Sequence, residues 1–379
     1  MAIYLDYNAS TPMHTEVVET MINAYRQEFG NADSRTHIFG DRARQIVEKA
    51  RHSIADLINV SSSEVFFTSG ATESDNIAIL GLKEYADKIG KKHIVTTSIE
   101  HKAVLQPIKK LESQGFDVTY INPDSSGSVR SEDVINAVRK DTLLVSVMHV
   151  NNETGIIQPI KEIGDFLSDT NVIFHIDAAQ SFGKMIFEIR NSKYDLLSAS
   201  AHKMYGPQGV GVLVMRKKKY RLPPVNPIMH GGNQEHGLRP GTLPTALIAG
   251  LGKAAEIMQL NHSAYWNNYL NNKETFLELV RNSGVKYKIN GDQNLCIPNT
   301  INISFTGVNS EALMLAARNY CGISNGSACN SSNYSQSYVL GAMKYTPERI
   351  QSSVRISWGY EVFSVDDVIP LISCVKSLQ

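Results

Sequence analysis

Short, almost continuous apolar runs recur along the first 215 residues of this chain. They are rich in valine, isoleucine, leucine and phenylalanine, and most show no alternation of apolar and polar residues. Strands that are covered on both faces of a sheet have this pattern, so the runs predict a buried sheet. The predicted strands are residues 65–67, 93–97, 118–121, 143–147, 172–176, 196–198 and 210–214.

Amphipathic segments lie between these runs, at residues 72–86, 102–114 and 131–139. Alternation of strands and helices is typical of an α/β fold, so we expect a mainly parallel central sheet flanked by helices. Ligands of such folds bind beyond the carboxyl ends of the strands. Side chains that follow a predicted strand are therefore the first candidates for a site.

A different pattern begins after the last predicted strand. A long helical pattern runs from Leu243 through Met258, and a shorter mixture of helical and apolar segments follows at 273–282, 300–305 and 311–318. This mixture predicts a smaller α+β unit with a boundary near residue 261. The expected division is a large domain at 12–261 and a small domain formed by 1–11 and 262–379.

Composition excludes several classes of protein. The chain has 379 residues, of which 42% are apolar, and 37 basic side chains balance 37 acidic ones. This apolar content excludes intrinsic disorder, and the zero formal charge makes direct binding of nucleic acid unexpected. The N-terminus lacks a secretory leader pattern, and no run of 18 apolar residues occurs. We therefore expect a soluble, cytoplasmic protein without a membrane span.

The cysteines and histidines predict neither a metal site nor a disulfide scaffold. Cys296, Cys321, Cys329 and Cys374 are 25, 8 and 45 positions apart, which matches no metal-binding pair. So few cysteines favour a reducing, intracellular compartment. The 11 histidines form no HxH or HExxH pair, so no metal ligands are predicted.

A turn rich in small and hydroxyl residues follows the first long strand and opens a helix. Its sequence at residues 69–74 is Ser-Gly-Ala-Thr-Glu-Ser. Hydroxyl and backbone donors at a helix start can hold a phosphate, although the same residues also fit a simple helix cap. No lysine follows the glycine, so a nucleotide P-loop is not supported.

Polar side chains also follow two other predicted strands. His101 lies between a strand and a helix, a position that by itself fits a capping or surface residue. Residues 149–155, His-Val-Asn-Asn-Glu-Thr-Gly, end another apolar strand with a cluster of hydrogen-bonding groups. Such a concentration after a buried strand suggests the mouth of a site.

An acid and a lysine follow the next two strands. Asp177 ends the strand at 172–176, and Lys203 follows the strand at 196–198 with Ser200 and His202 beside it. A lysine for a Schiff base, an acid for a pyridine nitrogen, and hydroxyl and imidazole donors for a phosphate together suit pyridoxal phosphate. The alternative for Asp177 and Lys203 is a buried salt bridge.

Seven stretches of this sequence, in order, resemble the class V, fold-type I relatives of the aminotransferases, and among them the cysteine desulfurases of the NifS/IscS type. The resemblance spans essentially the whole chain. Its stretches are residues 5–12 (Leu-Asp-Tyr-Asn-Ala-Ser-Thr-Pro), 68–76 (Thr-Ser-Gly-Ala-Thr-Glu-Ser-Asp-Asn), 100–102 (Glu-His-Lys), 149–155, 175–180 (His-Ile-Asp-Ala-Ala-Gln), 200–203 (Ser-Ala-His-Lys) and 326–329 (Gly-Ser-Ala-Cys).

The resemblance implies a fold-type I transferase that uses pyridoxal 5'-phosphate. It implies that Lys203 binds the cofactor covalently and moves protons at the substrate α-carbon, and that Asp177 pairs with the pyridine nitrogen. Gln180 would contact the phenolic oxygen of the ring. His101 would stack on the ring and assist proton transfer.

The remaining binding residues are implied in the same way. Arg355 and Asn152 would bind the substrate carboxylate, a task that suits the guanidinium group of Arg355. Asn152 would also belong to the cofactor site. A homodimer is implied, in which Thr242 reaches the site of the other subunit. The residues implied to hold the phosphate are Ala71, Thr72, Ser200, His202 and Thr242.

Cys329 would be the nucleophile of the reaction. The resemblance implies that its thiolate takes the sulfur of L-cysteine as a persulfide, that L-alanine is released, and that an acceptor protein receives the sulfur. The surrounding residues are small and polar, so we expect a mobile loop. Cys296, Cys321 and Cys374 are predicted to be dispensable for turnover.

Two departures from the family pattern concern partners. Asn233 and His236 stand where these enzymes usually carry glycine and arginine, which could alter dimer contacts or the rim of the site. The loop after Cys329 has the length of the group that hands sulfur to proteins, but the chain ends soon after its last predicted helix. Fe-S cluster assembly, tRNA thiolation and DNA phosphorothioation therefore all stay open as pathways.

Other functions also stay open from sequence. Within the same cofactor class they are a selenocysteine lyase or another aminotransferase-like enzyme. Outside catalysis, the chain could be an inactive adaptor that keeps the fold. The basic run at 216–221 fits a solvated turn, or else a docking site for an acidic partner.

Overall fold

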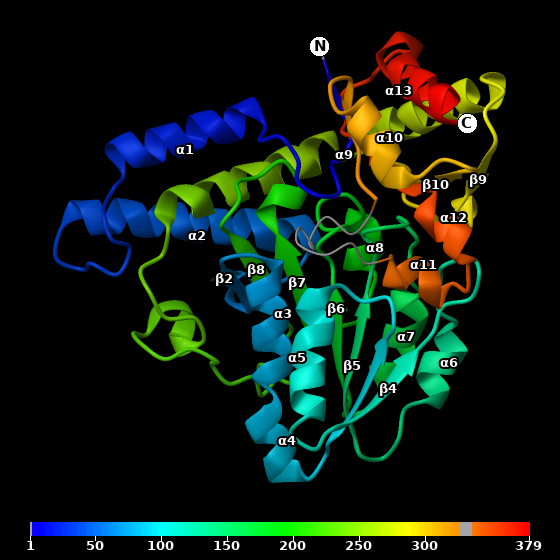
Figure 1. Ribbon diagram of the computed structural model, residues 1–379. Helices are drawn as coiled ribbons and strands as arrows, with labels where there is room; N and C mark the ends of the chain where they lie inside the picture. Colours follow the sequence, from blue (N-terminus) through cyan, green and yellow to red (C-terminus); the bar gives the residue numbers. More distant parts are fainter. Residues whose placement is uncertain (1, 326–335) are drawn as a thin grey trace.

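The computed structural model describes residues 2–325 and 336–379. Its largest feature is a seven-stranded sheet with the strand order β2-β8-β7-β6-β5-β3-β4 (Figure 1). Neighbouring strands from β7 to β4 are parallel, whereas β8 runs antiparallel to both β7 and β2. All seven predicted strands lie in this sheet: β2 (Val65–Thr68), β3 (His93–Thr97), β4 (Asp117–Ile121), β5 (Thr142–Met148), β6 (Ile173–Asp177), β7 (Leu196–Ser200) and β8 (Gly211–Met215).

Two hydrophobic cores, one on each face, explain why the strands read as unbroken apolar runs. In β5, Leu144 belongs to one core and the next residue, Val145, belongs to the other. Ile173 and Phe174 of β6 divide in the same way. Successive strand residues point to opposite faces, so a sheet covered on both sides needs apolar residues at most positions. Buried polar residues within the strands, such as Ser146 and His175, are hydrogen-bonded to each other. The prediction of an α/β fold with a mainly parallel, helix-covered sheet is confirmed.

Helices of the large unit cover both faces of this sheet (Figure 1). Residues of α3 and α5 contribute to one core, whereas residues of α2 and α9 contribute to the other. The helices are α1 (Thr15–Gln27), α2 (Ile38–Ile58), α3 (Ala71–Leu80), α4 (Lys83–Ile89), α5 (Lys102–Glu112), α6 (Ser131–Asn136), α7 (Ile160–Leu167), α8 (Ile186–Arg190) and α9 (Thr245–Asn282).

The single helix predicted for residues 72–86 is two helices in the structure, which corrects that expectation. The chain breaks between α3 and α4 at Gly81 and Leu82. A Cβ atom at Gly81 would lie only 2.5 Å from the carbonyl oxygen of Asn226, so the break lies where another segment approaches the backbone closely. Hydrophobic periodicity alone gives no signal of such a tertiary approach.

The C-terminal part of the chain forms a smaller layer above the sheet, drawn in yellow to red in Figure 1. The N-terminus joins it, because β1 pairs in parallel with β11 and Asp6 forms a bridge to Ser357. A three-stranded antiparallel sheet has the order β12-β10-β9. The elements are β1 (Ile3–Tyr4), β9 (Tyr287–Ile289), β10 (Thr300–Phe305), α10 (Ser310–Ala317), β11 (Cys321–Gly322), α11 (Tyr338–Ala342), α12 (Pro347–Gln351), β12 (Ser353–Ser357) and α13 (Val365–Leu378).

Helix α9 connects the two parts without interruption over 38 residues. It is much longer than the pattern at 243–258 indicated, and it includes the segment 273–282 that was predicted as a separate helix. The predicted domain boundary near residue 261 lies inside α9 and stays a prediction. None of the helices within residues 2–325 and 336–379 is long and apolar enough to cross a membrane.

The crossing of α2 and α9 provides a test of the packing. A Cβ atom at Gly252 of α9 would lie 2.6 Å from both Cα and Cβ of Ala50 in α2. Because backbone atoms cannot yield easily, we expect Gly252→Ala to lower the free energy of unfolding by about 1–3 kcal/mol. Denaturant unfolding followed by circular dichroism measures the change.

Gly341 of α11 is the matched control for this substitution. Apart from its chain neighbours and the backbone of its own helix, no atom of the described residues lies within 4 Å of a Cβ atom placed at Gly341. Gly341→Ala should therefore be neutral or raise the free energy of unfolding by up to about 1 kcal/mol. Equal effects of the two substitutions would show that the helix contact at Gly252 is not the cause.

Candidate active site

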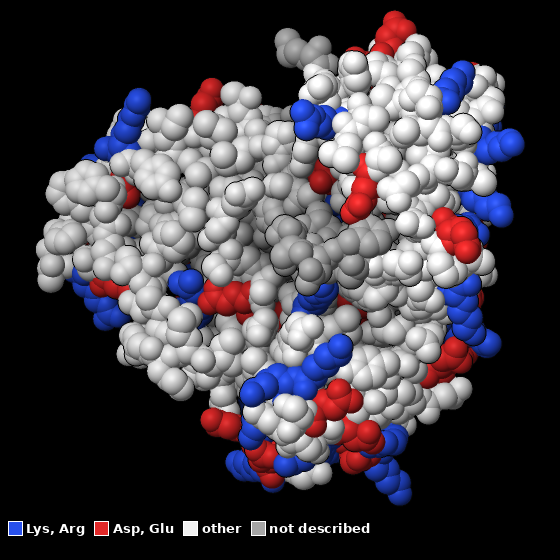
Figure 2. Space-filling model, in the orientation of Figure 1, with Lys and Arg blue, Asp and Glu red and all other residues white. Residues whose placement is uncertain are grey.

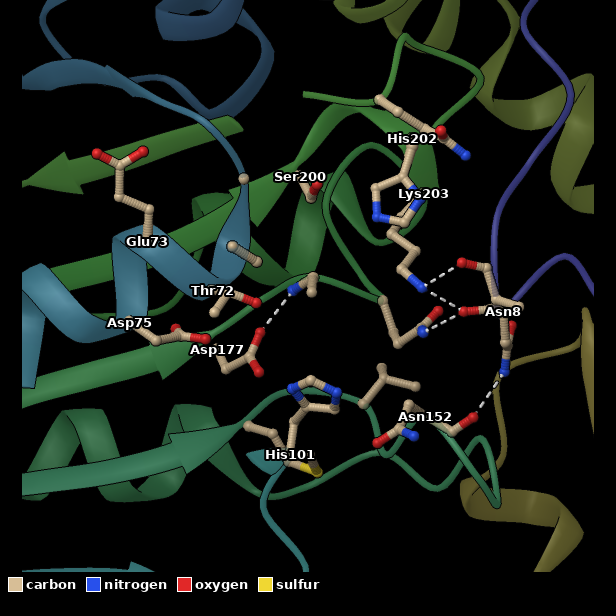
Figure 3. A pocket seen from close by; sticks show the side chains of 18 of the residues that line it. Asn8, Thr72, Glu73, Asp75, His101, Asn152, Asp177, Ser200, His202 and Lys203 are labelled. Atoms are coloured by element: carbon tan, nitrogen blue, oxygen red, sulfur yellow. Dashed lines mark hydrogen bonds between the residues drawn. The ribbon is translucent and has the colours of Figure 1, made fainter. Parts of the chain in front are cut away.

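The carboxyl ends of β5, β6 and β7 border a cavity of about 570 Å³. Nine of the ten residues predicted to bind the cofactor line this cavity, and so does Arg355. The nine are Ala71, Thr72, His101, Asn152, Asp177, Gln180, Ser200, His202 and Lys203. Parallel strands end at the same edge of a sheet. Residues as far apart in sequence as Ala71 and Lys203, which are separated by 132 positions, therefore line the same cavity. Figure 3 shows most of these side chains pointing into one space.

The start of α3 forms one side of the cavity. Gly70 precedes the helix with φ of +155°, and the helix has no side-chain cap, so its first amide groups are available to a ligand. A Cβ atom at Gly70 would lie 3.5 Å from Oγ of Ser200. The positive end of the helix dipole and the hydroxyl groups of Thr72 and Ser200 make this corner suited to a phosphate.

Asp177 lies at the end of β6 and is almost fully buried. One of its carboxylate oxygens accepts a hydrogen bond from the backbone N–H of Ala179 at 2.9 Å. Burial, followed by the nearby charge of Asp75, raises the pKa of Asp177 to about 6. A cationic N–H donor in the cavity would oppose both effects.

Asp75 of α3 is a second buried acid at this edge, and its significance was not predicted from the sequence. Neither oxygen of its carboxylate has a hydrogen bond, although Oδ1 lies 3.4 Å from Nε2 of His175. His175 is itself held between the hydroxyl groups of Ser146 and Ser198. An acid on the fully buried face of a helix was the sequence signal that could have identified Asp75.

Lys203 lies in the short 3₁₀ turn after β7, and its amino group faces the N-terminal segment (Figure 3). Its Nζ atom donates to the backbone oxygens of Asn8 at 2.5 Å and of Ala9 at 2.8 Å. Beside it, burial and then the charges of Lys203 and Lys184 lower the pKa of His202 to about 4. The imidazole of His202 is therefore neutral near pH 7 and can donate one hydrogen bond.

Asn8 organises the side of the cavity opposite α3, and this role was also not predicted. Its backbone oxygen accepts from Lys203 and from Nε2 of Gln180, while its side-chain amide donates to the backbone oxygen of Asn152. Its Oδ1 atom accepts from Thr300 of β10. The stretch 5–12 belongs to the family pattern, but nothing in its residue types predicts that the backbone carbonyls of Asn8 and Ala9 contact Lys203.

Arg355 of β12 enters the cavity from the small layer. Its guanidinium donates to the backbone oxygen of Asn152 at 2.9 Å and to Oδ1 of Asp6 at 2.6 Å. The Nε atom of Arg355 is buried and has no hydrogen bond. The side chain is thus fixed from two sides, and the N–H group on Nε is a buried donor that is left for a ligand.

His101 comes from the junction of β3 and α5. It is the N-cap of α5, and its Nδ1 atom accepts from the backbone N–H of Ala103 at 3.2 Å. In the neutral imidazole, the proton is then on Nε2. The capping interpretation and the cofactor interpretation of His101 are therefore compatible, because the cap fixes the ring beside the cavity.

Several buried polar atoms around the cavity have no hydrogen-bond partner, which tests whether pyridoxal phosphate fits. They are Oε1 of Gln180, Oδ1 of Asn152, Nε of Arg355 and both carboxylate oxygens of Asp75. Unpaired buried polar atoms are costly, so a ligand with complementary groups is expected here. A phosphate for the α3 start, a ring nitrogen for Asp177 and a carbonyl carbon for Lys203 match the donors and acceptors present.

Two predicted site residues do not appear in this cavity. Thr242 is exposed and does not line it. Cys329 lies outside the described residues. Among the described residues, no group of three histidine, cysteine or acidic side chains could hold a metal ion.

Comparison with known proteins agrees with this geometry. The family model for aminotransferase class-V matches residues 3–366. The chain belongs to the aminotransferase class-V family. Members of this family are pyridoxal phosphate enzymes, and within it this chain is of the NifS/IscS-type cysteine desulfurase group. The resemblance on which the sequence prediction was based is thereby confirmed.

Relatives of known name support the assignment to this group. The chain is 44% identical to cysteine desulfurase IscS of Vibrio campbellii, over 95% of this chain and 88% of the relative. Among solved structures, a NifS-like protein has a TM-score of 0.91 and 35% identity, covering 100% of this chain and 99% of that chain. DndA from Streptomyces lividans has a TM-score of 0.81 and 40% identity, covering 94% and 99% of the two chains.

Glu100 precedes His101 in the chain of this desulfurase-type protein, and its carboxyl group is fully buried. Its Oε1 atom accepts from Oγ1 of Thr97 at 2.7 Å and from the backbone N–H of Met148 at 3.0 Å, and Oε2 has no partner. Burial raises the pKa of Glu100 to about 8. The group therefore keeps its proton at neutral pH.

This pKa predicts a pH dependence of stability. Between pH 4.5 and 8 the folded protein holds the Glu100 proton and the unfolded chain does not, so stability falls as pH rises. Glu100→Gln keeps the acceptor for Thr97 and Met148 but cannot titrate. Its free energy of unfolding should therefore fall less with rising pH than that of the wild type, and the two slopes should differ by up to about 1.4 kcal/mol per pH unit. Urea unfolding at pH 5.5 and pH 8 measures the difference.

Glu278→Gln is the control, because Glu278 is exposed on α9. It should follow the pH dependence of the wild-type protein. If Glu100→Gln and the wild type lost stability in parallel over this range, Glu100 would not be protonated in the folded state.

Proposed function

We propose that this chain removes sulfur from L-cysteine, releases L-alanine and carries the sulfur as a persulfide on Cys329 to an acceptor protein. The observation that carries the proposal is one cavity that combines Lys203, Asp177 and the start of α3 with Arg355. A solved neighbour described as SspA in complex with cysteine supports cysteine as the substrate. It has a TM-score of 0.82 and 36% identity over 96% of this chain and 100% of that chain.

The proposed roles of the chain's residues follow from their positions. Arg355 and Asn152 hold the substrate carboxylate, for which the unpaired Nε of Arg355 is a donor. Pyridoxal phosphate, when bound, supplies an electron sink that makes the α-proton of the amino acid acidic. Asp177 keeps the ring nitrogen protonated, and Lys203 moves the proton at the α-carbon.

The sulfur-transfer step is the task of Cys329. Its thiolate attacks the substrate sulfur, an S–S bond forms as the Cβ–S bond breaks, and the carbon takes the electron pair and then a proton. The sum is L-cysteine and a Cys329 thiol giving L-alanine and a Cys329 persulfide, without an external oxidant. Of the other cysteines, burial raises the pKa of Cys296 to about 11 and also raises that of Cys321, so both are poor thiolates.

Substitution of Cys329 tests this proposal. Cys329→Ser should lower alanine and sulfide release from L-cysteine with a reductant by at least about a hundredfold, because the nucleophile is lost. It should keep the visible absorbance of the bound cofactor. Cys374→Ser, at a half-buried cysteine on α13, is the control and should retain full activity.

Two further results would decide between alternatives. Turnover by Cys329→Ser at the wild-type rate would exclude the persulfide step, and a strong preference for L-selenocysteine would favour a selenocysteine lyase. Lys203→Ala should lose the absorbance of the covalently bound cofactor. A wild-type protein that lacks this absorbance after addition of pyridoxal phosphate would favour an inactive adaptor.

The acceptor is proposed to be a protein rather than a nucleic acid. On the face in Figure 2, acidic and basic side chains lie side by side over the lower part of the molecule. Such a surface provides no extended basic footprint for a polyanion. Fe-S cluster assembly, tRNA thiolation and DNA phosphorothioation all remain compatible, because in each a protein could take the sulfur first. The free thiols of Cys296, Cys321 and Cys374 suit a reducing compartment such as the cytoplasm.

A homodimer is also part of the proposal. Large apolar side chains are exposed on α1 (Tyr25, 61%), between α1 and α2 (Phe29, 71%) and at the start of α2 (Ile38, 56%). Phe29 and Phe39 stack on each other with ring centroids 5.5 Å apart. An exposed cluster of this kind marks an interaction surface, and a second copy would also bring Thr242 to the cavity.

The dimer is tested by charging this cluster. Phe29→Asp should convert the dimer to a monomer in light scattering and should weaken cofactor retention, because the partner's contribution to the phosphate site is lost. Leu315→Asp, at an exposed leucine (66%) on α10, is the matched control and should stay dimeric. A wild-type protein that is monomeric at micromolar concentration would contradict the proposal.

A further inference from the structure

The two described ends of the chain segment that contains Cys329 are both tied to residues of the active site. On the N-terminal side, Ser324 and Arg355 exchange two backbone hydrogen bonds, from the N–H of Ser324 at 3.2 Å and from the N–H of Arg355 at 2.5 Å. On the C-terminal side, the chain is described again from residue 336 onward. Ser337 there contacts a buried acid that the proposed reaction does not use.

This acid is Glu153, whose side chain is directly bonded to Ser337. The hydroxyl of Ser337 donates to Oε2 of Glu153 at 2.5 Å, and both residues are buried. The same hydroxyl accepts from the backbone N–H of Leu340 at 3.1 Å, as the N-cap of α11. Ser337 thus links the start of α11 to the carboxylate of Glu153. Hydrogen bonds to charged groups are among the stronger ones in proteins, so this link is a firm one when Glu153 is ionised.

Glu153 is held rigidly next to Asn152. The side-chain oxygen of Asn151 accepts from the backbone N–H groups of Glu153 and Thr154, both at 2.9 Å. The side chain of Asn302 in β10 donates to the backbone oxygen of Glu153 at 3.0 Å. The backbone at Glu153, next to Asn152 that is proposed to bind substrate, is therefore held by contacts that do not involve the Glu153 side chain.

The start of α11 has a second attachment close to His101. The hydroxyl of Tyr338 donates to the backbone oxygen of Glu100 at 2.7 Å. Ile99, which precedes Glu100, forms a small core with Val339 and Leu340 of α11. The C-terminal anchor of the segment is therefore fixed against the residues beside both His101 and Asn152.

We propose that Glu153 is a positioning residue for sulfur transfer, which acts through Ser337 to fix the start of α11, the described C-terminal end of the segment that contains Cys329. Cys329 precedes Ser337 by eight positions. The inference rests on the proposed role of Cys329, since it concerns how often that thiol meets the substrate sulfur. Misplacement of a reacting group by about 1 Å can cost about a hundredfold in rate.

The charge of Glu153 gives this attachment a pH dependence. Burial raises the pKa of Glu153 to about 7, against the lowering effects of the Ser337 hydroxyl and of the charges of Arg355, His101 and Lys102. Below this pH the carboxylate is neutralised and its hydrogen bond from Ser337 weakens. The sulfur-transfer step should therefore slow as pH falls through 7, even when substrate binding does not change.

The test separates substrate binding from sulfur transfer in the holoenzyme. Rapid mixing with L-cysteine monitors binding through the absorbance of the cofactor, and mass spectrometry of quenched samples monitors the persulfide on Cys329. Ser337→Ala and Glu153→Ala should leave the binding phase within about twofold and slow persulfide formation about tenfold or more. Because both act on one contact, the double variant should be no slower than the single ones.

Conservative variants distinguish positioning from general loss of structure. Ser337→Thr keeps the hydroxyl and should restore the wild-type rate. Glu153→Gln keeps the shape but not the charge, so its persulfide rate should rise less steeply between pH 6 and 8 than that of the wild type. In the wild type the ionisation of Glu153 adds to the formation of the Cys329 thiolate, which is common to both proteins. Ser364→Ala is the matched control, because Ser364 caps α13 and donates to Asp367 at 2.8 Å in the same manner.

The possible outcomes are distinct. Ser364→Ala should lower the melting temperature but not the persulfide rate, and an equal slowing in this variant would overturn the positioning role. Wild-type persulfide rates in Ser337→Ala would also overturn it, and so would a persulfide rate in Glu153→Gln that rises between pH 6 and 8 as steeply as that of the wild type. Failure of the wild-type protein to form any persulfide on Cys329 would instead disprove the proposed function itself.

Discussion

The buried negative charge at the end of β6 is the constraint on which the site depends. Asp177 and Asp75 approach each other at this edge, and within the described residues no lysine or arginine forms an ion pair with either. Burial of like charges is unfavourable, which is why the pKa of Asp177 rises to about 6. A protonated ring nitrogen would compensate this charge. The protein fold therefore favours the binding of a ligand that places a cationic N–H group beside Asp177. The hydrogen bond from Ala179 orients the Asp177 carboxylate in advance.

This edge is formed by a sheet whose own requirements are simple. The two cores require mostly apolar residues on both faces, so the side chains that can reach a ligand lie where the strands end. Met148, Asp177 and Ser200 each occupy such an end. The small layer then closes the cavity from above with Arg355, and the N-terminal segment closes it with Asn8. The site therefore depends on contacts between three parts of the chain that are distant in sequence.

The sequence predicted the parts of the fold that depend on local pattern. All seven strands of the large sheet were found, because continuous apolar runs report directly on burial. The break at Gly81 and the full length of α9 were missed, because the first depends on the approach of Asn226 and the second on packing along the whole molecule. Similarly, Lys203 and Asp177 were predicted as site residues because of their residue types. The contact of the Asn8 backbone oxygen with Lys203 was not predicted, because a backbone carbonyl has no signature in the sequence. Asp75 was within a quoted motif, but only the structure places it beside Asp177.

The contact between Glu153 and Ser337 illustrates why contacts at functional sites are difficult to predict from sequence. The two residues are 184 positions apart, and each has an ordinary local explanation, as part of a polar turn and as a helix cap. Neither explanation accounts for a carboxyl group that is buried with a raised pKa rather than exposed to water. A protein retains such a group at a cost in stability when it fixes one specific arrangement, here the meeting of the large sheet with the start of α11. The same edge of the sheet thus holds the acid that is proposed to pair with the cofactor and, on our inference, the acid that positions the sulfur carrier.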